Sequence, residues 1–512
     1  MNVPSHPVLS CAEAKAWESQ LLRDEAAEWA AMQHAGAAIA DEIVQDYREM
    51  GGFPGNARIL VLVGKGHNGG DALLAAGELL RKYPGASAEV VFAFDQDSLR
   101  PLAARAWQPH RESNRVRVSP GLADPAAQAA TYDLCLDGVF GMQFRRPLDE
   151  KVAELLARAN THPRIRFRAA IDLPSGLGEQ NADTVFRADF TYATGVVKEP
   201  VLRPENGPFV GRVRYLDLGF FPVERATPGT PGRILLADVL SPLAALRRAQ
   251  TDKRTYGHLF VVGGSLSYPG AVVLAVRAAL RSGVGLVTAF VPESLVADYS
   301  ARHPEAMWVG CPVNAAGAMT PAGFSRVGER ISRATALAVG PGLTADPGAL
   351  SFAARLAAEA SVPLLLDADA LRPEVVEKAA GRPFIVTPHA GELSRIAPLL
   401  IDGNRVKTPF GVVVAKGPIT RVLCRGDTYH SLFGGPVLAR GGSGDLLAGL
   451  TAGLLAQNPA DPLLAACRGV VWHGRSADLL ARARGQVAVE ISEILEHLGR
   501  ALVPTPCPTS PS

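Results

Sequence analysis

The sequence predicts two consecutive α/β domains, each with a parallel β-sheet packed between layers of helices. Short apolar runs that end in Gly or Asp alternate with stretches of helical periodicity along most of the chain. The alternation stops at residues 223–232, which are rich in Pro, Gly and Thr, and then begins again. The chain has 512 residues, which is long enough for two large domains that each bury a core without disulfide bonds.

The individual elements follow from these patterns in chain order. The first half has strand patterns at residues 58–63, 89–94, 132–137 and 167–172, and a helical pattern at residues 71–80. The second half has strand patterns at residues 258–262, 335–339, 362–367, 383–387 and 411–415, and helical patterns at residues 445–455 and 463–482. Strands with helices between them indicate crossover connections and therefore parallel sheets.

The domain boundaries follow from the same patterns. We expect one domain over residues 1–225, a second over residues 226–504, and a disordered tail rich in Pro, Ser and Thr over residues 505–512. The connection from Glu392 to Lys416 is short and contains Pro409. We therefore expect a truncated crossover helix in that connection.

Composition excludes several classes of function. The chain has 52 basic and 50 acidic residues, so it shows no electrostatic footprint for nucleic acid or an anionic membrane. Its six cysteines are far apart and form no C-x-x-C pair, which argues against zinc and redox motifs and suits a reducing cytosol. Residues 1–10 resemble no secretory signal, and residues 271–291 contain Arg277 and Arg281, which interrupt any membrane span. We expect a cytoplasmic protein.

A glycine-rich turn follows the first strand of the first domain. Gly64, Gly66 and Gly69 satisfy G-x-G-x-x-G, and Asp95 closes the next strand. Glycines at a helix start let the backbone approach a phosphate, but a plain tight turn has the same pattern, and both interpretations stay open. Asp71 would place a negative charge near any phosphate, whereas Asn68 adds an oxygen suited to a cation or a hydroxyl.

Two further strands of this domain end in oxygen-bearing side chains. Asp137 begins the stretch DGVFG, and Asp172 begins DLPSG, which contains Ser175. The carboxyl ends of parallel strands meet at one crevice, and such oxygens together with backbone carbonyls suit a hard cation. The alternative is that both aspartates are helix caps or turn residues.

These segments carry a resemblance. Residues 1 to about 225 resemble the YjeF N-terminal domain, the NAD(P)H-hydrate epimerase family, at residues 32–36, 64–71, 137–141 and 171–177. The resemblance implies a Rossmann-like three-layer αβα fold and a K⁺ ion held by Asn68, Asp137 and Ser175. It also implies binding of the hydrated nicotinamide nucleotide by His67, Asn68, Gly69, Gly70, Asp71, Gly141, Met142, Gln143, Phe144, Arg145, Arg146, Pro147 and Asp172. His67 and Ala72 depart from the residues common in that family.

A second glycine-rich turn, ARGGSGD, ends at Asp445 before a helix. Its backbone could face an anion, and the carboxylate could take a proton from a substrate hydroxyl during phosphoryl transfer. The loop lacks the Lys-Ser/Thr pair of a Walker A motif, and a capped helix start remains the alternative. Four other strand ends carry polar loops, at residues 340–342, 367–369, 387–392 and 416–420. A single His389 among them is more often a buried or capping histidine than a ligand.

The second half carries its own resemblance. Residues from about 230 to 504 resemble the YjeF C-terminal domain, the ADP- or ATP-dependent NAD(P)H-hydrate dehydratase with a ribokinase-like three-layer αβα fold, in these loops and at residues 261–265 and 268–271. The resemblance implies binding of the hydrated nucleotide by Ala271, Gly342, His389 and Asp445. It implies binding of ADP or ATP, with Mg²⁺, by Lys416, Gly417, Pro418, Ile419, Thr420 and Gly444. Residues 252–255 depart from the family pattern.

Together the two resemblances imply a metabolite-repair enzyme. The first domain would interconvert the R and S epimers of the hydrates NADHX and NADPHX, with Asp172 transferring a proton. The second would dehydrate the S form, with Asp445 as the base. A homo-oligomer, a tetramer by family analogy, is also implied. The alternative is a ribokinase-superfamily small-molecule kinase with a non-catalytic nucleotide-binding first domain. A binding scaffold and an NAD-dependent dehydrogenase are weaker alternatives.

Overall fold

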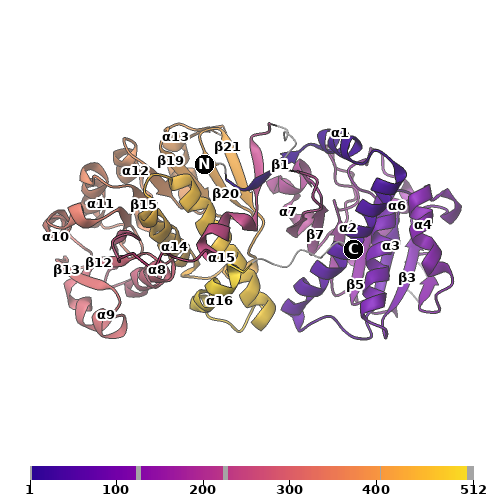
Figure 1. Cartoon of the computed structure of the whole chain (residues 1–512), viewed down its shortest axis with the longest axis horizontal. Coiled ribbons are helices and arrows are strands. Elements are labelled where there is room, and N and C mark those ends of the chain that lie inside the picture. Colours follow the sequence, from indigo (N-terminus) through magenta and orange to yellow (C-terminus); the bar gives the residue numbers. More distant parts are fainter. Residues whose placement is uncertain (1–2, 123–128, 223–228, 404, 504–512) are drawn as a thin grey trace. The chain divides into compact units, whose positions relative to one another are not determined.

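The computed structural model describes residues 3–122, 129–222, 229–403 and 405–503 (Figure 1). The chain separates into two compact units. His6–Thr230 forms the N-terminal unit, and Pro231–Pro506 forms the C-terminal unit together with the described part of Met1–Ser5. Most of the expected linker, residues 223–228, and the expected disordered tail, residues 505–512, lie outside the described residues.

The N-terminal unit is built on a seven-stranded sheet whose strand order is β4-β3-β2-β5-β6-β7-β9. All of its strand pairs are parallel. The strands are β2 (Arg58–Val63), β3 (Ser87–Phe92), β4 (Val116–Val118), β5 (Leu134–Gly138), β6 (Arg168–Ile171), β7 (Phe190–Thr194) and β9 (Arg212–Leu216). The expected parallel α/β fold of this unit is confirmed.

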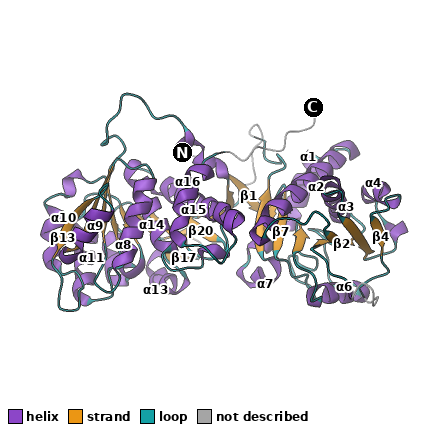
Figure 2. Ribbon diagram, turned by 90° about the horizontal axis from the view of Figure 1, so that it is seen from below, coloured by secondary structure: helices purple, strands orange, loops and turns teal. Residues whose placement is uncertain are grey.

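Helices cover both faces of this sheet because alternate residues of each strand point to opposite sides. Ile59 and Val61 of β2 pack with α2 (Glu25–Tyr47), α3 (His67–Lys82) and α4 (Pro101–Arg111), whereas Leu60 and Leu62 pack with α6 (Glu150–Thr161). In Figure 2, α6 lies on the opposite side of the strands from α2, α3 and α4. The unit therefore has three layers.

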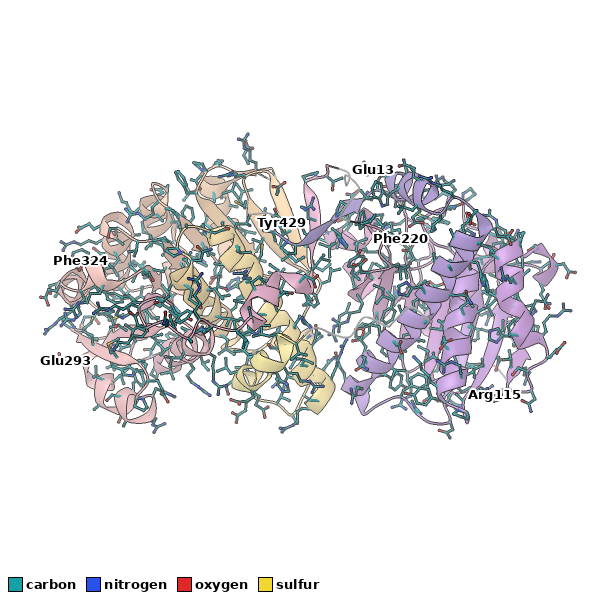
Figure 3. All side chains as sticks on the ribbon, viewed as in Figure 1. Glu13, Arg115, Phe220, Glu293, Phe324 and Tyr429 are labelled. Carbon is teal, nitrogen blue, oxygen red and sulfur yellow. The ribbon has the colours of Figure 1, made fainter. Side chains whose placement is uncertain are left out.

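A small parallel pair lies beside these layers. β1 (Ser5–Leu9) pairs with β8 (Val197–Lys198), with Leu9 opposite Lys198. The helix α1 (Cys11–Leu21) follows β1, and the Trp17 indole N–H donates a hydrogen bond of 2.9 Å to the Phe220 carbonyl. Figure 3 shows Phe220 below α1, the helix that carries Glu13. The short helix α7 (Gly207–Val210) precedes β9.

The C-terminal unit has the strand order β13-β12-β11-β14-β15-β16-β19-β20-β21-β10. Its strands are β10 (Gly232–Leu235), β11 (His258–Val262), β12 (Leu286–Pro292), β13 (Met307–Cys311), β14 (Ala336–Val339), β15 (Leu364–Leu366), β16 (Phe384–Val386), β19 (Gly411–Ala415), β20 (Thr420–Cys424) and β21 (Asp427–Ser431). The strands predicted from the sequence pair in parallel as expected, whereas β20, which the sequence did not predict, runs antiparallel to β19 and β21. Short turns join these three strands, and a short turn allows only an antiparallel pair.

This sheet also lies between two helix layers. Val261 packs on the side of α8 (Pro269–Arg281), α14 (Ser443–Gln457), α15 (Pro462–Arg484) and α16 (Ile494–Ala501). Val262 packs on the side of α10 (Phe324–Gly328), α11 (Pro347–Glu359), α12 (Pro373–Ala379) and α13 (Ala390–Leu400). The remaining elements are α9 (Val296–Arg302), β17 (Ile401–Asp402) and β18 (Arg405–Val406). In the described part of the chain, no helix is long and apolar enough to cross a membrane.

The expected truncation of the crossover between Glu392 and Lys416 is wrong. The helix α13 has 11 residues and connects β16 to the parallel strand β19. It fits because it begins directly after the β16 loop, with His389 as its N-cap. Pro409 lies after the helix, in the segment that leads into β19.

Helix α14 approaches α8 closely because it carries glycine where the two helices meet. A Cβ atom on Gly449 would lie 2.0 Å from the carbonyl oxygen of Ala275, and one on Gly453 would lie 2.1 Å from the hydroxyl of Ser282. Both contacts are far shorter than van der Waals separation. This close packing fixes the axis of α14, whose first turn carries Asp445.

We expect Gly449→Ala to destabilise the C-terminal unit by about 1–3 kcal/mol, because the added methyl group meets a backbone carbonyl that cannot move aside. The matched control is Gly499→Ala in α16, where a Cβ atom has no neighbour within 4 Å. That change should leave stability unchanged or raise it by up to about 1 kcal/mol through helix propensity. Urea unfolding followed by circular dichroism measures both. Equal effects of the two changes would contradict the packing argument.

Candidate functional sites

The turn from β2 to α3 is glycine-rich because the chain folds tightly on itself there. The Gly64 N–H donates a hydrogen bond of 3.1 Å to Gly138, and a Cβ atom on Gly64 would lie 1.9 Å from the Val139 carbonyl oxygen. A Cβ atom on Gly69 would lie 2.2 Å from the Gly64 carbonyl oxygen, and one on Gly70 would lie 2.3 Å from Met32. Close packing against backbone thus accounts for Gly64 and Gly69 without a ligand, whereas the neighbour of Gly70 is the end of the flexible Met32 side chain.

Asn68, Asp137 and Ser175 come together at the carboxyl ends of β2, β5 and β6. The Ser175 hydroxyl donates to Asp137 Oδ1 at 2.6 Å, and its backbone N–H donates to Asp137 Oδ2 at 2.7 Å. The Phe140 N–H donates to the Ser175 hydroxyl at 2.8 Å, and the Asn68 amide donates to the Phe140 carbonyl at 2.8 Å. The three predicted metal ligands are therefore linked through hydrogen bonds to the backbone of Phe140 and to one another.

Asp137 and Ser175 are fully buried. Burial raises the pKa of Asp137 to about 6, against the hydrogen bonds from Ser175 and Val139, which favour the ionised form. A cation beside this carboxylate would relieve the same burial cost. Among the described residues, no group of three His, Cys, Asp or Glu side chains could hold a metal ion.

Asp172 lies at the end of β6 in a left-handed backbone conformation, with a φ of 64°. Its backbone N–H donates to Tyr192 on the neighbouring strand at 2.9 Å. The Lys198 ammonium donates to Asp172 Oδ1 at 2.6 Å, and both side chains are buried. Non-glycine residues in this conformation are uncommon and cluster at active sites. The backbone turn directs this carboxylate toward Lys198.

Two more carboxyl groups share this region. Glu18 on α1 lies 3.4 Å from the Lys198 ammonium. Asp71 on α3 has a buried Oδ1 that has no hydrogen-bond partner among the described residues. Burial, followed by the charges of Asp172 and Glu18, raises the pKa of Asp71 well above its usual value. The cluster thus holds one ammonium and three carboxyl groups.

The loop after β5 passes beside this cluster. A Cβ atom on Gly141 would lie 3.1 Å from Asn68 Oδ1 and 3.5 Å from Asp172 Oδ2, so glycine leaves space between the two. Phe144 is buried against Phe140, and Met142 packs with the apolar residues around Trp17. The other residues expected to bind substrate are exposed: Gln143, Arg145, Arg146, which pairs with Asp183, and Pro147. At the start of α3, His67 lies 3.5 Å from Glu28 of α2.

Neither Lys198 nor Glu18 was among the site residues predicted from the sequence. The sequence signal for Lys198 is that a charged residue directly follows the apolar pair Val196 and Val197. All three residues are buried. Such a charge needs a buried partner. Glu18 has no comparable signal, because α1 mixes charged, polar, small and apolar residues and Glu18 follows no distinct pattern in it.

The second predicted site forms around Asp445, in the first turn of α14. Lys416 at the end of β19 donates to Asp367 Oδ1 at 3.0 Å, and the Thr387 hydroxyl donates to the same oxygen at 2.6 Å. A Cβ atom on Gly444 would lie 3.3 Å from the Lys416 ammonium. Three strand ends and the glycine turn therefore meet here.

Electrostatics around Asp445 favour a proton acceptor that works near neutral pH. Burial and the charge of Asp367 raise the pKa of Asp445 to about 7, against the opposing effect of Lys416. A general base is most effective when its pKa lies near the working pH. Asp367 and Thr387, which orient Lys416, were not among the predicted site residues.

The other predicted residues lie on neighbouring loops. Gly342, with a φ of 69°, approaches Ala271 so closely that a Cβ atom on Gly342 would lie 3.1 Å from the Ala271 Cβ. His389 caps α13: its Nδ1 accepts from the backbone of Gly391 at 3.0 Å, which leaves its exposed Nε2 facing Glu392 at 3.4 Å. The turn from β19 to β20 contains Gly417, Pro418 and Ile419, and the Thr420 hydroxyl donates to the Gly417 carbonyl at 3.4 Å.

Comparisons with known proteins agree with both resemblances. Residues 29–199 match the family described as YjeF-related protein N-terminus, and residues 259–500 match NAD(P)H-hydrate dehydratase. The chain is 33% identical to a bifunctional NAD(P)H-hydrate repair enzyme of Thermosynechococcus vestitus, over 97% of each chain. It is 35% identical to the enzyme of that name from Gloeobacter violaceus, over 93% of each chain. Matches that span both units do not favour the small-molecule kinase alternative.

A solved structure is similar to the C-terminal half. It is an ADP/ATP-dependent NAD(P)H-hydrate dehydratase from Bacillus subtilis, co-crystallised with ATP and Mg²⁺. It is 25% identical in sequence, covers 52% of this chain and 96% of its own, and has a TM-score of 0.42.

We expect Ser175→Ala to destabilise the N-terminal unit by about 1–3 kcal/mol, because it removes the hydroxyl hydrogen bond to the buried Asp137 carboxylate and leaves the Phe140 N–H without its acceptor. The control is Ser19→Ala on α1, whose exposed hydroxyl bonds only within its own helix. This control should change stability by less than about 0.5 kcal/mol. Thermal unfolding measures both, and equal stability of the two variants would contradict the expectation.

Proposed function

The chain belongs to the family of bifunctional NAD(P)H-hydrate repair enzymes, and on that premise we propose that it restores hydrated NADH and NADPH to their active forms. The N-terminal unit interconverts the R and S epimers, and the C-terminal unit dehydrates the S epimer. One observation carries this function: the same chain holds a buried acid–base cluster around Asp172 and a second around Asp445, each at the carboxyl ends of parallel strands.

Dehydration requires a better leaving group than hydroxide. Transfer of a phosphoryl group from ADP or ATP to the C6 hydroxyl supplies one. Asp445 takes the hydroxyl proton, the oxygen bonds to phosphorus, and the bond to the nucleotide breaks. Phosphate then departs with the C6–O electron pair, and loss of a proton from the adjacent ring carbon restores the double bond. The free N–H groups at the start of α14 suit the transferring phosphoryl group.

The family resemblance divides the residues around Asp445 into two sets. Lys416, Gly417, Pro418, Ile419, Thr420 and Gly444 are proposed to hold the adenine nucleotide, and the proximity of the Lys416 ammonium to Gly444 supports this. Ala271, Gly342, His389 and Asp445 are proposed to hold the hydrated nucleotide. Mg²⁺ would arrive with the nucleotide and offset the charge of its phosphates.

For epimerisation, Asp172 is proposed to transfer the proton at the hydroxyl-bearing carbon. Asn68, Asp71 and Gly141 surround the same space and are proposed to hold the substrate together with His67, Gly69, Gly70, Met142, Gln143, Phe144, Arg145, Arg146 and Pro147. Asn68, Asp137 and Ser175 fit K⁺, because carboxylate, amide, hydroxyl and carbonyl oxygens are the ligands of hard cations. When bound, K⁺ supplies positive charge beside the buried Asp137 and so orders the loop after β5.

The family resemblance further supports a cytoplasmic homo-oligomer, a tetramer, that acts on both NADHX and NADPHX. Light scattering of the purified protein at micromolar concentration tests the assembly: four times the 53.9 kDa chain mass is the expected result. A monomer would contradict it.

We expect Asp445→Asn to abolish nucleotide-dependent recovery of absorbance at 340 nm from hydrated NADH, while exchange between the two epimers continues. The wild-type dehydration rate should fall as the pH drops through about 7, because the pKa of Asp445 is raised to about 7 and only its ionised form accepts a proton. Calorimetry should show that the variant still binds ADP. Full turnover by the variant would contradict the role of Asp445.

We expect Asp172→Asn to abolish epimerisation. Absorbance recovery should then stop at the fraction of S epimer, after subtraction of spontaneous exchange, while the initial dehydration rate stays normal. Removing K⁺ from the wild-type protein should slow epimerisation alone, and Asn68→Ala should raise the K⁺ concentration needed. Recovery past the S fraction at the wild-type rate in Asp172→Asn would contradict the assignment.

A further inference from the structure

Lys198 is buried in the N-terminal unit, and neither proposed reaction uses its side chain. Its ammonium donates to Asp172 Oδ1 at 2.6 Å and to the Thr194 carbonyl at 3.2 Å, and it lies 3.4 Å from Glu18 Oε1. The residue is 2% exposed. An ammonium has three hydrogens, and three acceptors of the protein surround this one. Lys198 therefore has no donor left for a substrate, and it acts through its neighbours.

The three carboxyl groups around Lys198 cannot all be ionised, because one buried cation offsets one charge. Asp172 is closest to the ammonium, at 2.6 Å against 3.4 Å for Glu18. Burial raises the pKa of Glu18 and of Asp71, and the charge of Asp172 adds to both shifts. Burial opposes the charged form of Lys198, but Asp172 and Glu18 together raise its pKa above the usual value. The geometry therefore favours a Lys198–Asp172 ion pair, with Glu18 as a more distant partner of the same ammonium.

Other titratable groups surround this cluster at longer range. Burial and nearby acids raise the pKa of the Cys11 thiol to about 12, so this thiol stays neutral in the working range. The further charged groups near Cys11 are Glu179 and Arg145. Neither is placed in direct contact with Lys198. Lys198 thus pairs directly with Asp172, and Glu18 is a second acid near the same ammonium.

We propose that Lys198 is a positioning residue of the epimerase site, which holds the Asp172 carboxylate ionised and oriented, and that Glu18 competes with Asp172 for the same ammonium. The inference rests on the proposed role of Asp172 as the group that transfers the proton. The inference also predicts in which direction each substitution changes the protonation of Asp172. Loss of the cation makes protonation of Asp172 easier, whereas loss of the competing acid makes it harder.

The test is the pH dependence of epimerisation by the full-length chain. Epimer exchange is followed by chromatography without adenine nucleotide, so that dehydration does not consume the product. In Lys198→Met, the acid limb of the kcat profile should move up by about one pH unit or more, because a neighbouring cation has an effect of that size on a carboxyl group. The KM should stay within about threefold of wild type, because Lys198 has no free donor for the substrate.

Glu18→Gln is the second variant, and it keeps the size and shape of the side chain. Its acid limb should move in the opposite direction, to lower pH, because one competing negative charge is gone. Lys198→Arg keeps the positive charge and should return the limb toward its wild-type position. The control is Lys82→Met, which removes a surface lysine paired with Asp41 in the same unit and should leave the profile unchanged.

The outcomes separate this inference from the proposed function. Unshifted profiles in both Lys198→Met and Glu18→Gln, with Asp172→Asn inactive, would overturn the role of Lys198 and keep that of Asp172. Full epimerisation by Asp172→Asn would overturn the proposed base itself. If Lys198→Met does not fold, the direction of the shift in Glu18→Gln decides: a shift to higher pH or no shift overturns the inference.

Discussion

The burial of charge at the carboxyl ends of parallel strands is the constraint on which both sites depend. A charged group taken out of water is costly unless it is paired, so each sheet end holds an ion pair: Lys198 with Asp172, and Lys416 with Asp367. Each ion pair holds charge at a fixed position beside a loop, and the backbone geometry brings that loop close to the pair. The loops at these ends are ordered because the buried charges have one satisfactory set of partners.

The two units use this arrangement in related ways. In each, a further carboxyl group lies near the ion pair and has a raised pKa because it is buried close to another acid: Asp71 in the first and Asp445 in the second. Titratable groups whose surroundings give them clearly different pKa values are suited to proton transfer. The different connection of the strands, including the antiparallel β20, shows that the two units reach this arrangement on different sheets.

Glycine positions set how closely the chain can approach itself around these charges. At Gly64 and Gly449, an added Cβ atom would strike a backbone carbonyl, so the spacing of strand, turn and helix depends on the missing side chain. At Gly141, the missing side chain instead leaves space next to Asn68 and Asp172. The same residue type thus serves close packing at two places and access to the site at a third.

The sequence by itself determined the α/β class and the loops that carry Asp172 and Asp445. It also determined the exact bounds of several strands, such as Arg58–Val63 and Gly411–Ala415. These features are predictable because apolar periodicity and glycine turns are local signals. The sequence misjudged the helix Ala390–Leu400 and did not predict the antiparallel strand Thr420–Cys424, because strand pairing and connection depend on long-range contacts. The partners Lys198 and Glu18 were decided by the tertiary structure alone. They lie 26 and 154 positions from Asp172 in the sequence, and only folding brings their charges into one buried volume.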